Sequence, residues 1–358
     1  MSDSLTSAYP VLGRRLPRRP LAELPTPVVQ HEISLANGTH GITVKRDDVS
    51  NPHYGGNKIR KLEFILQRAL DRGAKRVATF GAAGSNHALA TAVLAREIGL
   101  ECTCFLAHQK RTPNVPLTLN MHRQLGTEIV RYGGSINQLE LFREYLQHRQ
   151  AWVVPMGGSS WLGSVGFVNA GLELAQQIAE GTIPCPERIY IAAGTLGSTA
   201  GLALGLAAAE LPTELHAVCV VDRAFGNPTI LDRLMRKTAL MLNRIDPSFD
   251  AGTADRVRLV WRGEYLAGGY AVVDEQTNAA VEIARIALGL KLETTYTGKA
   301  MAAILHDLRL PDYDGAPYLF WNTYNSRELP VTAAKPSTLD NIPEDFLRYY
   351  ELVEDEND

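Results

Sequence analysis

The feature that most constrains the fold is an alternation of apolar, helix-like stretches with short runs of β-branched residues. Glycines at positions 73, 99 and 126 separate them. The pattern predicts helices and strands in turn over residues 61–72, 76–80, 85–98, 102–106, 117–124 and 128–132. Strands that alternate with helices form parallel sheets that helices cover on both faces. We therefore expect an open α/β layer in this part of the chain.

A second set of the same kind begins near residue 188. It predicts strands over residues 188–193 and 216–222 and helices over residues 199–209 and 274–289. The glycine-rich residues 155–160 lie between the two sets and suit a domain crossover. A chain of 358 residues is long enough for two such domains. Ligands of open parallel sheets bind beyond the carboxyl ends of the strands, so the loops after residues 80 and 193 are the expected sites.

The composition excludes several classes of protein. The formal net charge is −3, which gives no positive field for a nucleic acid partner. The most apolar helix candidate, over residues 199–211, is too short to cross a bilayer, so no membrane partner is expected. The four cysteines are few, and Cys102 and Cys104 lie within an apolar run rather than at metal-ligand spacing. We expect a cytoplasmic protein without a metal site.

The sequence Gly55-Gly56-Asn57-Lys58 is the first candidate site. Glycines let the backbone approach a ligand closely, and a lysine at the start of a helix can be partly desolvated so that its amine acts as a nucleophile. Such a lysine suits a Schiff base. The alternative is a turn followed by an exposed lysine, and these four residues do not decide between the two.

Two further loops, each between a strand and a helix, suit anions. In Gly81-Ala-Ala-Gly-Ser85-Asn86-His87 the helix start could bind a carboxylate or a phosphate, although Ser85 or Asn86 could be a plain N-cap and His87 alone is more often structural. In Gly194-Thr195-Leu196-Gly197-Ser198-Thr199 two glycines and three hydroxyls form a better phosphate site than a turn needs. This loop matches neither the dinucleotide nor the P-loop pattern. Tyr296-Thr297-Gly298-Lys299 is locally typical of a polar loop, with no function required by its spacing.

One nucleophilic lysine, one phosphate site and one anion-binding helix start are the parts that a pyridoxal phosphate enzyme needs. On these motifs the chain resembles the 1-aminocyclopropane-1-carboxylate deaminase and D-cysteine desulfhydrase family. The matching stretches follow the family's order between about residues 20 and 310: Leu24-Pro-Thr-Pro27, Lys45-Arg-Asp-Asp48, Gly55-Gly-Asn-Lys-Ile-Arg-Lys-Leu-Glu-Phe64, Ser85-Asn-His87, Pro155-Met-Gly-Gly-Ser159, Gly163-Ser-Val-Gly-Phe167, residues 194–202 and Tyr296-Thr-Gly-Lys-Ala-Met301.

The resemblance implies a fold, a cofactor and an assembly. The fold is α/β with two open parallel-sheet domains, tryptophan synthase β-like, which is fold type II of the pyridoxal phosphate enzymes. We expect a smaller domain over residues 59–165 that carries the Ser85-Asn86-His87 loop, and a larger one over residues 1–58 and 166–340 that carries Lys58 and the phosphate loop. Residues 341–358 are expected to form an acidic tail. The cofactor is pyridoxal 5'-phosphate, the substrate a small amino acid, and the assembly a homodimer.

The resemblance also implies a role for each site residue. Lys58 resembles the lysine that binds the cofactor covalently, and Gly194, Thr195, Leu196, Gly197 and Ser198 resemble its phosphate site. Asn86 matches the amide beside the cofactor's ring oxygen, and Thr297 the residue beside the pyridine nitrogen. The residues implied to contact the substrate are Ser85, Asn86, His87, Gly158, Tyr270 and Tyr296. The expected catalytic residues are Lys58, Ser85 and Tyr296, with the Lys58 amine or Ser85 as the base.

Thr297 bears on the type of reaction. A carboxylate there would keep the ring nitrogen protonated, whereas a hydroxyl has no charge with which to hold that proton. The deaminase branch of the family carries Glu at this place, and Thr297 and His87 both resemble the desulfhydrase branch. The preferred hypothesis is a carbon–sulfur lyase that carries out α,β-elimination on D-cysteine or a related β-substituted amino acid. The products would be a 2-oxo acid, ammonia and sulfide.

Two alternatives remain open. The same cofactor could support deamination of 1-aminocyclopropane-1-carboxylate or elimination from another β-substituted amino acid. The chain could instead bind a ligand without turnover or be a nicotinamide oxidoreductase, but the glycine fingerprint of the latter is missing. Two segments depart from the family. Ala-Ala-Gly84 lacks the usual glutamine, and Phe320-Trp-Asn-Thr-Tyr-Asn-Ser326 lacks paired glycines, so that Asn322 and Tyr324 either enter the pocket or pack harmlessly beside it.

Overall fold

The computed structural model of the chain describes residues 3–133 and 150–350, which fall into two compact units. Unit 1 comprises residues 1–65 and 158–327, and unit 2 comprises residues 66–157 and 328–358. Each unit has its own sheet of parallel strands with helices around it, so the predicted fold class is confirmed. One boundary lies within helix α3 (Lys58–Asp71), a few residues beyond the predicted position.

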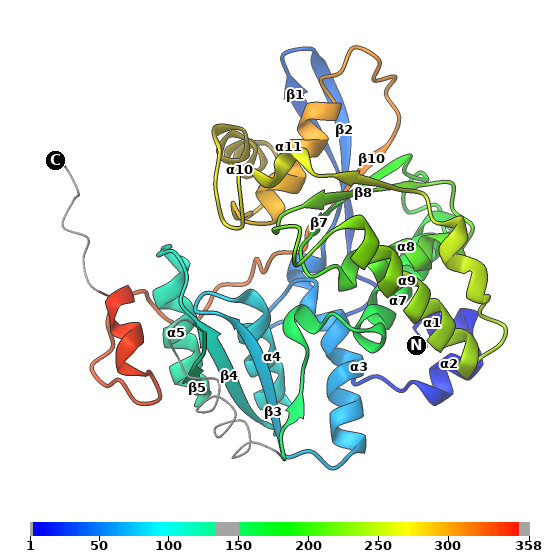
Figure 1. The fold of residues 1–358 in the computed structure, drawn as a ribbon. Helices are drawn as coiled ribbons and strands as arrows, with labels where there is room; N and C mark the ends of the chain where they lie inside the picture. Colours follow the sequence, from blue (N-terminus) through cyan, green and yellow to red (C-terminus); the bar gives the residue numbers. More distant parts are fainter. Residues whose placement is uncertain (1–2, 134–149, 351–358) are drawn as a thin grey trace. The chain divides into compact units, whose positions relative to one another are not determined.

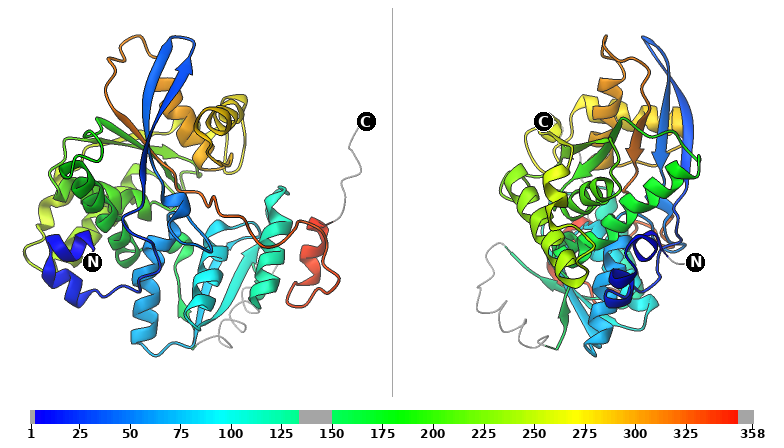
Figure 2. Two further views of the ribbon diagram at one scale, coloured as in Figure 1. Left: turned by 180° about the vertical axis from the view of Figure 1, so that it is seen from behind. Right: turned by 90° about the vertical axis from the view of Figure 1, so that its right-hand side faces the viewer.

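Unit 1 is built on a six-stranded sheet in the order β1-β2-β10-β7-β8-β9 (Figure 1). Its strands are β1 (Val28–Leu35), β2 (Gly38–Lys45), β7 (Arg188–Ala193), β8 (Glu214–Cys219), β9 (Leu259–Arg262) and β10 (Tyr318–Trp321). All neighbouring pairs are parallel except β1 and β2, which form an antiparallel hairpin that the sequence pattern does not predict. Only the last four residues of β2 pair with β10, and the hairpin extends beyond them (Figure 2).

Helices cover both faces of this sheet because its strands turn alternate side chains to two apolar clusters. In β7, Ile189 and Ile191 face one cluster, and Tyr190 and Ala192 face the other. The first face packs against α1 (Ser4–Ala8), α2 (Pro10–Arg15), α7 (Trp161–Ala179), α8 (Gly197–Ala208) and α9 (Pro228–Ile245), and the second against α10 (Glu275–Leu288) and α11 (Thr297–Asp307) (Figure 1).

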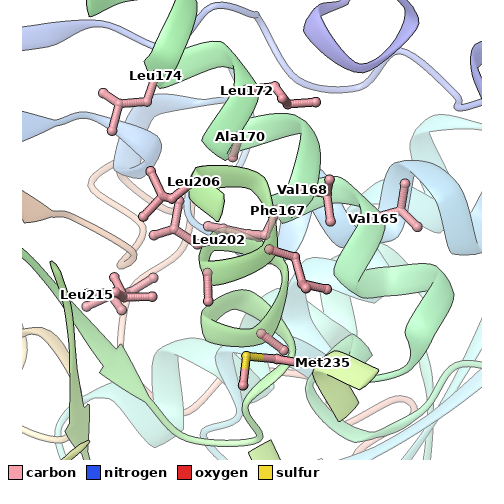
Figure 3. Close-up of a cluster of buried hydrophobic side chains, with 14 of the residues drawn as sticks. Val165, Phe167, Val168, Ala170, Leu172, Leu174, Leu202, Leu206, Leu215 and Met235 are labelled. Atoms are coloured by element: carbon pink, nitrogen blue, oxygen red, sulfur yellow. The ribbon is translucent and has the colours of Figure 1, made fainter. Parts of the chain in front are cut away.

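Helices α7 and α8 pack closely against one another in unit 1. Figure 3 shows Ala170 of α7 beside Leu202 and Leu206 of α8 within the buried cluster. A Cβ atom added at Gly205 would lie 2.5 Å from the carbonyl oxygen of Val168, so only glycine permits this approach. The crossing fixes the position of α8, whose first residue, Gly197, belongs to the predicted phosphate loop.

Unit 2 contains a parallel sheet in the order β5-β4-β3-β6. Its elements are β3 (Arg76–Ala82), α4 (Asn86–Glu97), β4 (Glu101–Ala107), α5 (Asn114–Leu125), β5 (Glu128–Arg131) and β6 (Trp152–Val153). Each helix and strand that the alternation predicts between residues 61 and 132 is present. Local periodicity is sufficient here because each strand and the helix after it are neighbours in the chain.

The end of the described chain belongs to unit 2, which corrects two predicted boundaries. The sequence predicts residues 328–340 in the larger domain and residues 341–358 as a tail. Instead the Asn120 side chain donates to the carbonyl of Thr332 at 2.7 Å, and the Gln109 N–H donates to the Tyr349 hydroxyl at 2.9 Å. The 3-10 helix Glu344–Tyr349 buries Phe346 and Tyr349. The acidic composition of this segment led to the expectation of a tail, although it contains these two buried aromatic residues. Residues 351–358 lie outside the described residues.

Candidate active site

The candidate residues of unit 1 gather at one edge of its sheet. In the parallel register Lys45 pairs with Trp321, and Ala193 pairs with Cys219, so these strands end at the same edge. The segments that lead to Lys58 and to the phosphate loop begin there. Ligands of α/β sheets bind beyond this edge. The structure therefore places two predicted sites, far apart in sequence, within one region of unit 1.

Lys58 is the first residue of α3, and its amine is part of a chain of hydrogen bonds. The Nζ atom donates to Asn57 Oδ1 at 2.7 Å, and Asn57 Nδ2 donates to Ser198 Oγ at 2.9 Å. This chain joins the predicted nucleophile to the predicted phosphate loop. Burial lowers the pKa of Lys58 to about 8, and the negative charge of Glu293 acts in the opposite direction. A lysine amine with this pKa is partly neutral near physiological pH, as a nucleophile must be.

The divergent segment after β10 supports the residues that precede Lys58. The Asn57 N–H donates to the carbonyl of Thr323 at 3.1 Å, and the Gly55 N–H donates to Asn325 Oδ1 at 2.7 Å. Within unit 1 the segment therefore packs against the turn that presents the amine.

The predicted phosphate loop turns the chain from β7 into α8. Leu196 adopts the left-handed conformation with φ 70°, and the helix begins at Gly197. The sequence assigned no role to Ser159, whose hydroxyl donates to Thr195 Oγ1 at 2.7 Å and accepts from the Gly197 N–H at 3.1 Å. The available signal in the sequence was that Ser159 ends the stretch Pro155-Met-Gly-Gly-Ser159, which matches the family. Because first-turn N–H groups have no acceptor within their helix, the start of α8 suits a phosphate.

The residues at this edge fit pyridoxal phosphate. Thr199 Oγ1 in the first turn of α8 and Asn322 Nδ2 after β10 are buried and have no hydrogen-bond partner among the residues that the structure describes. Buried polar groups normally have a partner, so these two atoms indicate a polar ligand. A Cβ atom at Gly194 would come within 3.1 Å of the Tyr296 ring, so glycine leaves room there. The hydroxyl groups at the start of α8 and the amine of Lys58 also suit this cofactor.

We expect Gly197→Ala to weaken cofactor binding. An added Cβ would lie 2.7 Å from Ser159 Oγ and 3.0 Å from Ser159 Cα, so either Ser159 or the phosphate loop must shift and their hydrogen bonds must change. The dissociation constant of pyridoxal phosphate, measured by fluorescence titration of the apoprotein, should rise about tenfold or more, a change of about 1.4 kcal/mol. Gly41→Ala is the control because open space surrounds that position. Equal affinities of Gly197→Ala and the unaltered protein would contradict this prediction.

Residues 296–299 begin a helix and are not the polar loop that the sequence predicts. Helix α11 starts at Thr297 with Tyr296 as its N-cap residue. The carboxylate of Glu293 stabilises this start: its Oε1 atom accepts the N–H groups of Tyr296 and Thr297, both at 2.9 Å, and lies 3.2 Å from the Thr297 hydroxyl. Sequence reasoning missed both the helix and Glu293, because the capping carboxylate comes from before the usual N-cap position.

Replacing Glu293 tests its effect on Lys58. The Glu293 charge raises the pKa of Lys58 against the effect of burial, so Glu293→Gln should move that pKa below about 8. The measurement is competitive acetylation of the apoprotein between about pH 6 and 10, with the Lys58 peptide quantified by mass spectrometry. Glu282→Gln, on the exposed face of α10, is the control and should leave the midpoint unchanged. A midpoint that stays in place in Glu293→Gln would refute the assigned interaction.

The two tyrosines predicted to face the substrate meet one another. The hydroxyl oxygens of Tyr270 and Tyr296 are 2.9 Å apart, and the rings pack edge to face at 6.0 Å. Burial is the largest cause that raises the pKa of both phenols, so both keep their protons near physiological pH. The contact supports the inclusion of Tyr270 in the site, and the pair can donate one hydroxyl hydrogen to a ligand.

The third predicted loop lies in unit 2, at the start of α4. Ser85 is the N-cap residue, and its hydroxyl accepts a first-turn N–H at 3.2 Å. His87 is buried, and its Nε2 atom lies 3.0 Å from Thr79 Oγ1, which supports the structural interpretation that the sequence left open. The assignment of Ser85, Asn86 and His87 to the substrate stays a prediction. So does that of Gly158, which adopts φ 65° in unit 1.

Comparisons with known proteins agree with this geometry. A family model described as pyridoxal-phosphate dependent enzyme matches residues 20–318. D-cysteine desulfhydrase from Klebsiella pneumoniae (strain 342) is 33% identical over 86% of this chain and 94% of its own length. The protein of the same name from Yersinia enterocolitica (serotype O:8 / biotype 1B, strain NCTC 13174 / 8081) is 34% identical over 79% of this chain and 86% of its own.

Solved structures show the same fold. A crystal structure of an ACC deaminase homologue, 27% identical, aligns over 90% of this chain and 95% of its own with a TM-score of 0.71. A fungal L-serine ammonia-lyase from Rhizomucor miehei, 18% identical, aligns over 92% of this chain and 99% of its own with a TM-score of 0.57. At that identity the second likeness concerns the fold alone.

Proposed function

Because the chain belongs to the pyridoxal-phosphate dependent enzyme family, we propose that it is a lyase that converts D-cysteine and water to pyruvate, sulfide and ammonia. The observation that carries the proposal is the hydrogen-bond chain from Lys58 through Asn57 to Ser198, which joins the predicted nucleophile to the predicted phosphate loop. Two relatives named D-cysteine desulfhydrase, each matched over most of its length, support the choice of substrate.

In unit 1, Lys58, the loop over residues 194–198 and the hydroxyl of Thr297 would hold the cofactor. Asn86 of unit 2 stays a proposed partner of its ring oxygen. When bound, pyridoxal phosphate supplies the ring that takes up the negative charge left on the substrate's α-carbon. The protein supplies position and proton transfer, and these steps depend on its own side chains.

The neutral amine of Lys58 is the proposed acceptor of the α-proton, with Ser85 as the second candidate. A lysine with a pKa of about 8 can both accept and return a proton near physiological pH. Tyr296 keeps its phenolic proton because burial raises its pKa, so it is the proposed donor to the departing sulfur. Its partner Tyr270 holds the hydroxyl in place at 2.9 Å. The helix start at Ser85 is the proposed site of the substrate carboxylate.

Deamination of 1-aminocyclopropane-1-carboxylate is the second candidate function. It is favoured by the likeness to the ACC deaminase homologue. It is also favoured by the Glu293 carboxylate, which accepts a hydrogen bond from the Thr297 hydroxyl at 3.2 Å. Thr297 itself carries no charge with which to hold a proton on the pyridine nitrogen. Opening a cyclopropane demands more of the ring than expelling a thiol, so elimination remains the preferred reaction.

The proposed enzyme is a cytoplasmic homodimer. All four cysteines are free, and Cys102 and Cys104 lie with their sulfur atoms 3.8 Å apart without a bond, as suits a reducing compartment. Within residues 3–133 and 150–350, no helix combines the length and the apolarity needed to cross a membrane. Light scattering after size-exclusion chromatography tests the assembly, and a mass near the 39.2 kDa of one chain would reject the dimer.

Absorption spectroscopy with product assays tests the function. The purified protein, loaded with pyridoxal phosphate, is mixed with D-cysteine while its visible spectrum is recorded and sulfide and pyruvate are assayed. The same preparation is tested with L-cysteine and with 1-aminocyclopropane-1-carboxylate, for which 2-oxobutanoate and ammonia are assayed. A spectral change with sulfide from D-cysteine supports the lyase. Formation of 2-oxobutanoate without any sulfide would replace it by the deaminase.

A further inference from the structure

Lys299 is a buried cation in helix α11 to which the sequence analysis assigns no role. It lies in the first turn of α11, and its side chain is fully buried. Its Nζ atom donates to the carbonyl oxygen of Leu266 at 2.7 Å. Burying an ammonium group is costly unless it is well paired. The partner of Lys299 is a backbone carbonyl at the start of a loop far away in the chain, which indicates that the lysine holds this loop.

The loop that begins at Leu266 has an unfavourable backbone. Ala267, with φ 56°, and Ala271, with φ 59°, are in the left-handed region, and the two glycines between them also have positive φ. Left-handed residues other than glycine cost about 1 kcal/mol each and persist only where surrounding contacts hold them. The Leu266 carbonyl also accepts the Gly269 N–H at 3.3 Å, so the lysine and the turn share one acceptor.

This loop carries Tyr270, and the same helix turn contacts the loop at two points. Lys299 holds its start at Leu266, while Tyr296, three residues earlier, meets the Tyr270 hydroxyl at 2.9 Å. Tyr270 is 40% exposed, so packing covers only part of the residue. Without the lysine, the hydroxyl contact alone would have to hold a strained loop.

We propose that Lys299 is the positioning residue that sets the Tyr270–Tyr296 pair against the substrate. The identity of the substrate in this inference rests on the proposed function. The tether, by which we mean the hydrogen bond from Lys299 to the Leu266 carbonyl, rests on the geometry alone. Three acidic or ionisable neighbours, Asp274, Cys219 and Glu293, oppose the lowering of the Lys299 pKa by burial and favour the charged amine. A charged amine donates more strongly to a carbonyl than a neutral group does.

A double-mutant cycle tests the tether in the holoenzyme. Lys299→Met keeps the length and apolar stem but removes the donor; it should raise KM for D-cysteine about tenfold, with a smaller change in kcat. Tyr270→Phe should have a similar effect. Because both changes act through one tyrosine pair, the double variant should differ from either single variant by no more than about twofold. Independent effects that multiply in the double variant would overturn the proposal.

Two further variants separate positioning from general damage. Lys299→Arg keeps a cation and a donor and should recover most of the loss in KM. Lys291→Met, at an exposed lysine of the segment before α11, should leave the kinetics unchanged. A Lys299→Arg variant as impaired as Lys299→Met, with native unfolding behaviour, would count against a donor role.

Hydrogen exchange provides a readout that does not depend on activity. In the unaltered holoenzyme, the amide of Gly269 and the peptide over residues 266–273 should exchange slowly, because the loop is tethered. Lys299→Met should accelerate exchange there at least about tenfold and leave the peptides of α8 unaffected. Fast exchange in the unaltered enzyme would overturn the tether. Absence of turnover of D-cysteine with a protected loop would instead reject the proposed function and keep the tether.

Discussion

Lys58→Ala is expected to lower kcat/KM for D-cysteine by at least about a thousandfold, a loss of about 4 kcal/mol of transition-state stabilisation. The variant loses the partly buried amine that is the proposed link to the cofactor and the proposed carrier of the α-proton. Sulfide release under steady-state conditions measures the effect. The cofactor's visible absorbance in the same samples shows whether binding survives.

Two controls give this result its meaning. Lys75→Ala removes an exposed lysine and should retain full activity. Lys58→Arg keeps a positive charge, but a guanidinium stays protonated and cannot act as a nucleophile, so it should be nearly as inactive as Lys58→Ala. A Lys58→Ala variant with more than about a tenth of the normal rate would remove Lys58 from the mechanism.

The pH dependence of the same lysine follows from its environment. Burial lowers the pKa of Lys58 to about 8, so the fraction of neutral amine rises with pH up to about that value. Because the neutral form is the nucleophile, the rate at which the apoprotein takes up pyridoxal phosphate should rise with pH and level off above about pH 8.

Arg60→Leu is expected to destabilise unit 1 by about 3–5 kcal/mol, the usual cost of leaving a buried charge without its partner. The guanidinium of Arg60 donates to Asp47 at 2.8 Å and to Glu173 at 2.9 Å. Lys45 donates to Glu173 at 2.6 Å, and all four groups are almost fully buried. Urea unfolding, monitored by circular dichroism, measures the loss.

The buried network of Lys45, Asp47, Arg60 and Glu173 also predicts how stability changes with acid. Burial alone would raise the pKa of Glu173, but the positive charges of Arg60 and Lys45 outweigh it and lower the pKa to about 2. The pKa of Glu173 is lower in the folded protein than in the unfolded chain, where it is near 4.5, so the charged carboxylate stabilises the fold above about pH 4.5. This stabilisation is lost as the pH falls toward 2. Arg236→Leu breaks an exposed pair and is the control, which should leave the urea midpoint nearly unchanged. An equally small shift of the midpoint in Arg60→Leu would contradict the assigned role.

The network matters to the site because it supports the start of α3. The Gly56 N–H donates to the carbonyl of Asp47 at 2.7 Å, and Arg60 lies two residues after Lys58. The indole N–H of Trp321 donates to Asp47 Oδ2 at 2.9 Å and joins the end of β10 to the same group. The lysine therefore projects from a turn that a buried set of charges holds, which limits how far its amine can move.

The local pattern was sufficient to predict the strands and helices that pack against elements adjacent to them in the chain. The strand predicted over residues 188–193 is β7, and the helices predicted over residues 85–98 and 199–209 are present as α4 and α8. The family and its cofactor followed from eight short stretches in the right order and are confirmed by the family match over residues 20–318. Patterns of this kind are visible in a sequence because their spacing reflects helix and strand geometry.

Other features could not be predicted because their partners lie far away in the chain. The β1–β2 hairpin joins β10 across more than 270 residues, and the helix start at Thr297 depends on a carboxylate that no N-cap pattern includes. The Ser159 hydroxyl acquires its role from Thr195 and Gly197 of another loop. Nothing local to any of these residues indicates the contact.

The sequence by itself determined the family and its cofactor and the alternating strands and helices over residues 61–132 and 188–209, and it predicted the phosphate loop and the lysine. Only the tertiary structure decided the properties that chemistry depends on: the lowered pKa of Lys58, the meeting of Tyr270 with Tyr296, and the tether from Lys299. The physical reason is that a pKa and a hydrogen bond depend on desolvation and on distances between atoms. Both are set when residues from distant parts of the chain are buried together.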